Sequence, residues 1–380
     1  MTVHMPAPTL ANRSSFYSDN KLIIGLFGAN CSSGRAVTML DERWSGSWRD
    51  SLRLAQMADQ IGIDFMLPIG RWKGYGGTTD YQGATLETFT WASGLLASTK
   101  RITVFGTIHA PLYNPIMAAK MCVTADNVGE GRFGLNMVCG WNEGEFEMFG
   151  VQQRDHECRY EYAQEWMEIV LKAWSPEGEF DYEGEYLKLK GVRAKPKPWG
   201  GTRPLIMNAG SSDKGRAFAI RNCDAFFTTA SRENVAETQK RVREIKQLAR
   251  DLGRDLEVYT VGVVTCRPTM KEAQDYYHYA SVERADWSAV DSIMAIKGLT
   301  PESMGQEAFE KRRSQYANGM GGVPIVGDPE HVANELARLN VSGLRGIAIS
   351  MVNYADELPY FAQEVLPRLE AKGIRAPVRF

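Results

Sequence analysis

Several apolar stretches of this sequence are followed directly by polar side chains, and one stretch carries an amide inside it. Asn136 is the fourth residue of FGLNMV, a run with the composition of a buried strand. A buried amide needs hydrogen-bond partners, because leaving its donors and acceptor unpaired costs free energy. Either a neighbouring strand or water satisfies Asn136, or its amide faces a ligand, and both interpretations stay open.

A second group of residues could bind an anion. Gly210, Ser211 and Ser212 join a predicted strand to a predicted helix, where free backbone N–H groups and hydroxyls favour a phosphate. Ordinary capping of the helix by Ser212 or Asp213 would account for the same residues. The sequence alone does not separate these two explanations.

Three side chains in nearby segments could contact the same ligand. Arg159 and Tyr160 begin a long predicted helix and could reach a phosphate or a sugar, or they could form an exposed turn with a packed tyrosine. Glu145, in GWNEGEFEMFG, is either a ligand contact or a solvated carboxylate. These residues are therefore candidates that need a structural context.

Residues suited to proton transfer or nucleophilic attack are few. His109 has an ordinary pKa near neutrality, but no acidic neighbour in sequence supports a relay, and a lone histidine beside an apolar strand is usually structural. Nothing near Cys122 or Cys139 would lower a thiol pKa, so these are interpreted as small buried hydrophobes. The six cysteines and five histidines show no metal-ligand spacing, and no metal site is expected.

The composition excludes some classes of partner. The chain has 380 residues with 44 Lys+Arg and 46 Asp+Glu, a net charge of −2, which argues against a generally basic nucleic-acid-binding surface. No apolar run reaches the roughly 18 residues of a membrane helix, and the N-terminus lacks the pattern of a secretory signal. A cytoplasmic protein that binds neither nucleic acid nor membrane is the expectation.

The elements that must position these residues alternate along almost the whole chain. Short apolar runs such as KLIIGLFG are separated by segments of helical periodicity, which predicts a parallel sheet covered on both faces. No GxGxxG follows the first run, so a (β/α)8 TIM barrel is favoured over an open doubly wound sheet. We expect one α/β domain over residues 21–380, a flexible or docking arm over 1–20, and insertions after the fourth and seventh strands. The second insertion includes the polar segment 284–322.

A barrel would bring the candidates to one place, because functional residues of this fold lie where the strands end. Ile69, Gly70 and Arg71 follow the second predicted strand, and Thr107 ends the third. A site with an anion subsite but no acid–base dyad or metal suggests that a cofactor carries the chemistry.

The stretches GRFGLNMVCGW, DHECRYEY and NAGSSDKGRAF resemble the bacterial-luciferase-like flavin monooxygenases, above all those acting on pyrimidines, dimethylsulfone and alkanesulfonates. The resemblance spans roughly residues 21–371. It implies a TIM barrel that receives reduced FMN from a separate NAD(P)H:flavin reductase. With O2, a flavin peroxide at N5 or C4a would then oxidise a small organic or heterocyclic substrate and cleave a C–N or C–S bond. A homodimer or tetramer is expected, with 284–322 as a lid.

The resemblance also implies roles for individual residues. Gly70 and Arg71 would border the isoalloxazine, with Asn136 and Glu145 at its polar edge. The ribityl phosphate would be held by a second group of residues, namely Arg159, Tyr160, Gly210, Ser211 and Ser212. Thr107 and Asn136 match a pair that forms an oxygen pocket, and Ile69 stands where the pyrimidine enzymes have a methionine.

Two other functions fit the same predicted fold. A deazaflavin-dependent hydride-transfer enzyme would use the barrel without oxygen chemistry, and Thr107 with Asn136 argues against it. A non-catalytic flavin-binding protein would hold oxidised FMN and form no O2-dependent product. The identity of the substrate is not separable by sequence among pyrimidine-like heterocycles, sulfones, sulfonates and riboflavin.

Overall fold

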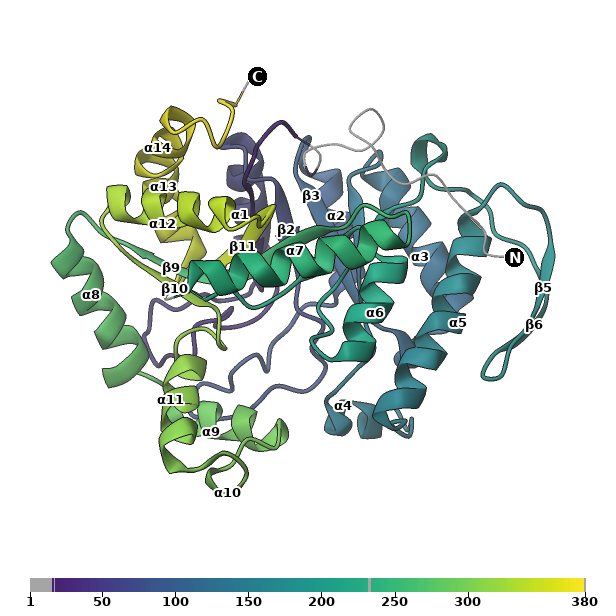
Figure 1. Cartoon of the computed structure of the whole chain (residues 1–380), viewed down its shortest axis with the longest axis horizontal. Helices are drawn as coiled ribbons and strands as arrows, with labels where there is room; N and C mark the ends of the chain where they lie inside the picture. Colours follow the sequence, from purple (N-terminus) through teal and green to yellow (C-terminus); the bar gives the residue numbers. More distant parts are fainter. Residues whose placement is uncertain (1–15, 17, 232–233, 379–380) are drawn as a thin grey trace.

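Eight parallel strands close into a barrel in the computed structural model, which describes residues 16, 18–231 and 234–378 (Figure 1). The ring closes because β9 pairs with β8 on one edge and with β11 on the other. The barrel strands are β1 (Ile23–Phe27), β2 (Phe65–Leu67), β3 (Thr103–His109), β4 (Phe133–Val138), β7 (Leu205–Asn208), β8 (Ala225–Phe227), β9 (Glu257–Cys266) and β11 (Gly346–Ser350). The predicted α/β barrel is confirmed.

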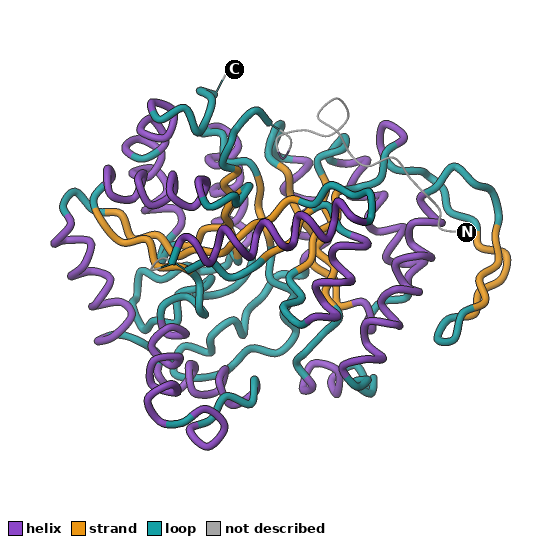
Figure 2. The backbone as a smooth tube through the Cα atoms, viewed as in Figure 1, coloured by secondary structure: helices purple, strands orange, loops and turns teal. Residues whose placement is uncertain are grey.

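Helices surround the strands and cover the outer face of the barrel (Figure 2). In α1, for example, Leu54, Ala55 and Ala58 recur at helical spacing and are buried, whereas the N-terminus is capped by Ser47. The helices of this layer are α1 (Trp48–Gln60), α2 (Thr88–Ala97), α3 (Pro115–Val128), α5 (His156–Trp174), α6 (Asp213–Asn222), α7 (Val235–Asp251), α12 (Pro329–Val341), α13 (Tyr354–Glu364) and α14 (Leu366–Ala371).

Aromatic side chains fill the barrel interior. Phe65 and Phe105 lie edge-on with ring centroids 5.9 Å apart, and Tyr259 lies 6.2 Å from Phe65. Glycines on the strands make room for these rings: a Cβ on Gly134 would come within 2.2 Å of the Phe105 ring. Of the arm predicted over 1–20, Phe16 and residues 18–20 are described, and the Phe16 ring stacks on Tyr259 at 5.2 Å. Residues 1–15 and 17 lie outside the described residues.

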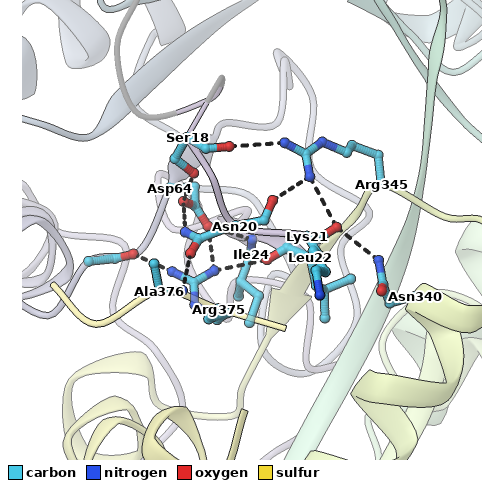
Figure 3. Close-up of polar contacts among 11 residues, drawn as sticks. Ser18, Asn20, Lys21, Leu22, Ile24, Asp64, Asn340, Arg345, Arg375 and Ala376 are labelled. Carbon is cyan, nitrogen blue, oxygen red and sulfur yellow. Dashed lines mark hydrogen bonds and ion pairs between the residues drawn. The ribbon is translucent and has the colours of Figure 1, made fainter. Parts of the chain in front are cut away.

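A buried ion pair closes the end of the barrel where the strands begin (Figure 3). Arg375 Nη1 donates to Asp64 Oδ2 over 2.6 Å, and the two side chains are 4% and 2% exposed. The other carboxylate oxygen accepts from Asn20 Nδ2 at 2.8 Å, and Arg375 also donates to the carbonyls of Leu22 and Gly62. Residues from both ends of the described chain thus meet on Asp64.

The first insertion follows β4, as predicted. It contains the short helix α4 (Glu143–Met148) and an antiparallel hairpin of β5 (Phe180–Glu183) and β6 (Lys188–Val192), followed by the 3-10 turn η3 (Trp199–Gly201). The hairpin projects at one side of the molecule (Figure 1). Another 3-10 turn, η2 (Ala110–Leu112), links β3 to α3.

The second insertion follows β9, also as predicted, and the polar segment 284–322 within it is helical. The elements of the whole insertion are α8 (Met270–His278), the π-helical turn η4 (Tyr279–Glu283), α9 (Trp287–Ile296), α10 (Pro301–Met304), α11 (Gln306–Ala317) and β10 (Val323–Gly327). Sequence patterns did not predict β10, which pairs in parallel with β9 outside the ring. The run is five residues long and contains Pro324, which cannot donate to a ladder. In the described part of the chain, no helix is long and apolar enough to cross a bilayer.

Candidate functional site

The mouth of the barrel, where the parallel strands end, is covered by the inserted helices. Helices α9–α11 and α4 lie at the end of the molecule opposite α14 (Figure 1). Residues that the sequence placed after strands β2, β3, β4 and β7 gather at this mouth.

Thr107 and Asn136 face each other across neighbouring strands. The register of β3 and β4 pairs them directly, and Asn136 Nδ2 donates to Thr107 Oγ1 over 3.0 Å. The Thr107 hydroxyl in turn donates to the carbonyl of Pro68 over 2.7 Å. Asn136 Oδ1 is buried and has no partner among the described residues. The pair therefore keeps one acceptor unpaired at the mouth.

Ile69 and Gly70 complete the wall beside this pair. The amide N–H of Ile69 donates to Asn30 Oδ1 at 2.8 Å, and Asn30 Nδ2 donates back to the carbonyl of Ile69 at 2.9 Å. A Cβ on Gly70 would lie 3.1 Å from both Thr107 Cγ2 and His109 Cε1. A side chain at Gly70 would crowd the wall, which explains why glycine suits this position.

His109 is buried behind Gly70. Burial lowers the pKa of His109 to about 4, against the raising effect of the Glu145 carboxylate and with the lowering effect of Arg71. The imidazole is therefore neutral near pH 7. A neutral, buried imidazole can pack against the wall of the mouth at no electrostatic cost. The structural interpretation of His109 is therefore favoured over a role in proton transfer.

Arg71 and Glu145 form a buried ion pair that fixes the loop after β2. Arg71 Nη1 lies 2.9 Å from Glu145 Oε1, with the two side chains 6% and 1% exposed. The same carboxylate oxygen accepts from the backbone N–H groups of Trp72 and Lys73. The guanidinium lies 4.6 Å from the centre of the Tyr75 ring, which is roughly parallel to Trp141. Glu145 is thus a structural carboxylate at the mouth and is not solvated.

The candidate anion subsite lies at the N-terminus of α6. Ser212 caps this helix by accepting from Gly215 N–H at 3.1 Å, and Tyr160 is hydrogen-bonded to Ser212. Gly210 must be small, because a Cβ there would approach the Tyr160 hydroxyl to 2.8 Å. Arg159 donates to the carbonyl of Gly140 over 2.7 Å. Ser212 is therefore the N-cap of α6, as one of the two explanations from the sequence has it.

The residues of the candidate anion subsite line a cavity of about 700 Å³, whereas Ile69, Gly70, Arg71, Thr107, Asn136 and Glu145 are not among its lining residues. It extends from the end of β4, two residues beyond Asn136, to the N-terminus of α6, and the segment 284–322 forms part of its wall. Its lining residues include Val138, Gly140, Trp141, Arg159, Tyr160, Gly210, Ser211, Ser212, Lys297, Arg312 and Tyr316. All five residues predicted for the phosphate end thus share one cavity.

A neighbouring cavity of about 480 Å³ lies at the end of β8 and beside the middle of β9, and it shares Ala209 and Ser211 with the first. Arg35, Arg216 and Arg241 line it together with Thr228 and Met320.

Sequence reasoning missed the cationic residues of the mouth. Arg35 follows β1 in CSSGRAVT, and Lys297 and Arg312 belong to the segment 284–322. Desolvation, together with the positive charges of Arg71, Arg35 and Arg312, lowers the pKa of Lys297 to about 8. The rule that strand ends carry function could have selected Arg35. Nothing in sequence spacing indicates that Lys297 lies over the mouth.

The cysteines show no sign of activation. Burial raises the pKa of Cys139 to about 12 and raises that of Cys122 well above its usual range. The six thiols are unpaired. Within the described residues, no group of three histidine, cysteine, aspartate or glutamate side chains could hold a metal ion.

Comparison with known proteins places this geometry in a family context. The model of the family described as luciferase-like monooxygenase matches residues 25–346. Pyrimidine monooxygenase RutA of Acinetobacter baylyi is 28% identical over 363 residues, which cover 92% of this chain and 95% of that protein. An FMNH2-dependent dimethylsulfone monooxygenase of Pseudomonas fluorescens is 28% identical over 354 residues, with 90% and 94% covered.

Among solved structures, the riboflavin lyase RcaE, bound to modified FMN and riboflavin, shares the fold of this chain. The TM-score is 0.82 at 22% identity, and the match covers 94% of this chain and 93% of the lyase.

Proposed function

The chain belongs to the luciferase-like monooxygenase family, and we propose that it is a two-component enzyme that uses reduced FMN and O2 to oxidise a small organic substrate. A separate NAD(P)H:flavin reductase would supply the reduced FMN. The reaction would cleave a C–N or C–S bond, as suggested by relatives named for pyrimidines and for dimethylsulfone. The observation that carries the proposal is the single cavity joining the end of β4 to the capped N-terminus of α6.

The residues present fit FMN in chemistry and in shape. The phosphate needs donors and positive charge, which Arg159, Tyr160 and Ser212 would supply at a helix N-terminus. A flat ring needs a surface from which no side chain projects. Gly70 offers such a surface beside Thr107, because it has no side chain of its own. The unpaired Oδ1 of Asn136 offers an acceptor for a ring N–H group.

At the ring end, Arg71 would border the isoalloxazine, and Glu145 would hold Arg71 and the following backbone in place. The ion pair is almost completely buried, so both partners are fixed before a ligand arrives. Such preorganisation avoids the cost of ordering charged side chains on binding.

When bound, reduced FMN supplies the electrons with which O2 is activated. The Thr107 hydroxyl and the Asn136 amide would form a polar niche for O2 in an otherwise apolar wall that includes Ile69. Thr107 donates to Pro68, which fixes its hydroxyl, and Asn136 donates to Thr107. The bond to Thr107 fixes the Asn136 amide, whose second N–H would stabilise developing negative charge, and the helices over the mouth would keep water out.

A binding titration tests the cofactor assignment. Under anaerobic conditions the wild-type protein is titrated with reduced FMN, oxidised FMN and reduced deazaflavin, and the reduced FMN is expected to bind most tightly. The double variant Arg159→Ala/Ser212→Ala should bind it at least tenfold more weakly. Ser98→Ala, on the exposed end of α2, is the matched control and should leave affinity unchanged.

An activity screen tests the reaction class. The protein is incubated with NADH, a flavin reductase, FMN, labelled O2 and a panel of sulfones, sulfonates, pyrimidines and flavins. A labelled oxygen atom in the product supports the proposal. Turnover without flavin, or preferential binding of deazaflavin, would show that it is wrong. A homodimer or tetramer, expected from relatives, is checked by light scattering on the same sample.

A further inference from the structure

Arg35 is a buried cation with few partners. It is 7% exposed, and only one of its donors has an acceptor among the described residues, namely Nη2 to the carbonyl of Gly319 at 2.7 Å. Its Nε is buried and unpaired. Burial lowers the pKa of Arg35, and the groups that oppose this are tyrosines and a cysteine rather than a carboxylate. Holding such a charge without a counter-ion is costly, which indicates that an anion completes the site.

Arg35 is held rigidly at the mouth of the barrel. Its guanidinium lies 4.5 Å from the centre of the Phe27 ring, at the end of β1. The bond to Gly319 ties it to the segment 284–322, and this close approach needs glycine, because a Cβ on Gly319 would clash with Val263 at 2.2 Å. Arg35 therefore presents its unused donors in a fixed orientation.

The surroundings of Arg35 carry more positive than negative charge. Arg35, Arg71 and Arg312 each lower the pKa of Lys297, so each of the three charges lies within electrostatic reach of Lys297. Glu145 pairs with Arg71. Among the described residues, Arg35, Lys297 and Arg312 have no carboxylate partner, which leaves an excess of positive charge around the mouth.

The FMN phosphate does not account for Arg35. Of the five residues predicted for the phosphate end, Ser211 lines both cavities, and the others, Arg159, Tyr160, Gly210 and Ser212, line the 700 Å³ cavity and not the 480 Å³ cavity. Arg35 lines the neighbouring 480 Å³ cavity, whose wall also includes Phe227, Val261 and Met320. Arg216 and Arg241 also line it, but they pair with Asp213 and Glu237. That cavity thus combines the cation of Arg35, which has no carboxylate partner among the described residues, with an apolar surface, as a small amphiphilic ligand requires.

We propose that the substrate is a small organic anion, such as a sulfonate or a carboxylate, whose charged group binds Arg35 while its carbon skeleton lies in the 480 Å³ cavity. This inference rests on the proposed function, because it assigns a substrate class to the same enzyme. Arg35 donates up to two parallel hydrogen bonds to the anionic oxygens. A neutral sulfone or an amide of the same length lacks the charge that Arg35 requires.

The test measures binding to the protein saturated with FMN, so that the phosphate site is filled. Isothermal titration compares butanesulfonate with butyl methyl sulfone, and pentanoate with pentanamide. Each anion is expected to bind at least about tenfold more tightly than its neutral counterpart. Equal or tighter binding of the neutral probes, or no binding of either anion, overturns the inference. This comparison uses the wild-type protein alone.

Variants then assign the effect to Arg35. Arg35→Met should lose at least about tenfold in affinity for the anions and leave FMN affinity unchanged, whereas Arg35→Lys should recover part of the loss. The matched control is Arg193→Met, an exposed arginine paired with Glu179 beside the hairpin. Undiminished anion binding by a folded Arg35→Met, or weakened FMN binding by that variant, contradicts the inference. Failure of the wild-type protein to bind reduced FMN contradicts the proposed function instead.

Discussion

The side-chain amide of Asn136 donates a hydrogen bond to the hydroxyl of Thr107 across the β3–β4 ladder, and that hydroxyl donates a hydrogen bond to the carbonyl of Pro68. Three neighbouring barrel strands are thereby linked at their ends by two hydrogen bonds. The direction of donation leaves Asn136 Oδ1 as the free acceptor. Substitutions of Thr107 or Asn136 should therefore affect the chemistry at the mouth more than the fold.

Asn136→Ala is predicted to slow the reaction of O2 with protein-bound reduced FMN by on the order of 100-fold, because a fixed donor near developing charge is lost. Stopped-flow absorbance measures the rate. The double variant with Thr107→Val should be little slower than the single variant, since the two groups act as a unit. Asn222→Ala removes a buried amide that bonds Gln164 away from the mouth, and it should leave the rate unchanged. A normal rate in folded Asn136→Ala would remove the oxygen niche from the proposal.

Glu145→Ala is predicted to lower the free energy of unfolding by roughly 3–5 kcal/mol, because it leaves the Arg71 charge buried without its partner. Urea denaturation measures the change. The exposed pair of Glu183 and Lys188 provides the control, and Glu183→Ala should change stability by less than about 1 kcal/mol. A similarly small effect at Glu145 would show that the ion pair does not hold the loop.

Arg375→Met should also lower the free energy of unfolding by about 3–5 kcal/mol, because it leaves the Asp64 carboxylate buried without its cation at the end of the barrel away from the mouth. FMN affinity should stay unchanged in the folded variant, because the ion pair lies at the end away from the mouth. Denaturation curves and an FMN titration on one preparation separate the two effects. Loss of FMN affinity with normal stability is the opposite of this expectation.

His109 should make stability depend on pH. Its pKa is lowered to about 4 in the folded protein from an ordinary 6.5, so the unfolded chain binds more protons between these values. The stability contributed by the neutral imidazole is fully present above pH 6.5 and is lost as the pH falls toward 4. The loss amounts to roughly 2 kcal/mol at about pH 5. Chemical denaturation of flavin-free protein at several pH values checks this. His109→Gln should flatten the dependence, and an unchanged slope would contradict the pKa shift.

Lys297 should react unusually well with an amine-acylating reagent, because its pKa of about 8 leaves much of it uncharged at mildly alkaline pH. Peptide mass spectrometry compares its labelling with that of Lys188, whose pKa is raised by its hydrogen bond to Glu183. Bound FMN brings negative charge to the same cavity and should slow the labelling of Lys297 alone. Equal protection of both lysines would indicate an effect remote from the cavity.

The barrel was predictable because its signals are local. Apolar runs such as FGLNMV form strands by composition, and the rule that parallel strands end together brought Thr107 and Asn136 to one mouth without contact information. The short strand β10 escaped prediction, because a five-residue run with a proline resembles a loop. Lys297 escaped for another reason: it lies at the mouth only through the path of the second insertion, which no local pattern specifies, whereas Arg35 follows β1 and could have been selected by the strand-end rule. The roles assigned to the site residues stay predictions until cofactor binding is measured.

The ion pair between Asp64 and Arg375 joins residues 311 positions apart. A ribosome makes the chain from the N-terminus, so β1 and β2 emerge long before the guanidinium that neutralises Asp64 exists. During that interval the aspartate can remain hydrated only if the end of the barrel where the strands begin stays open. Arg375 can therefore pair with Asp64 only after the chain leaves the ribosome, and a chain truncated before residue 375 should be more readily cleaved by protease around Asp64 than the released full-length chain.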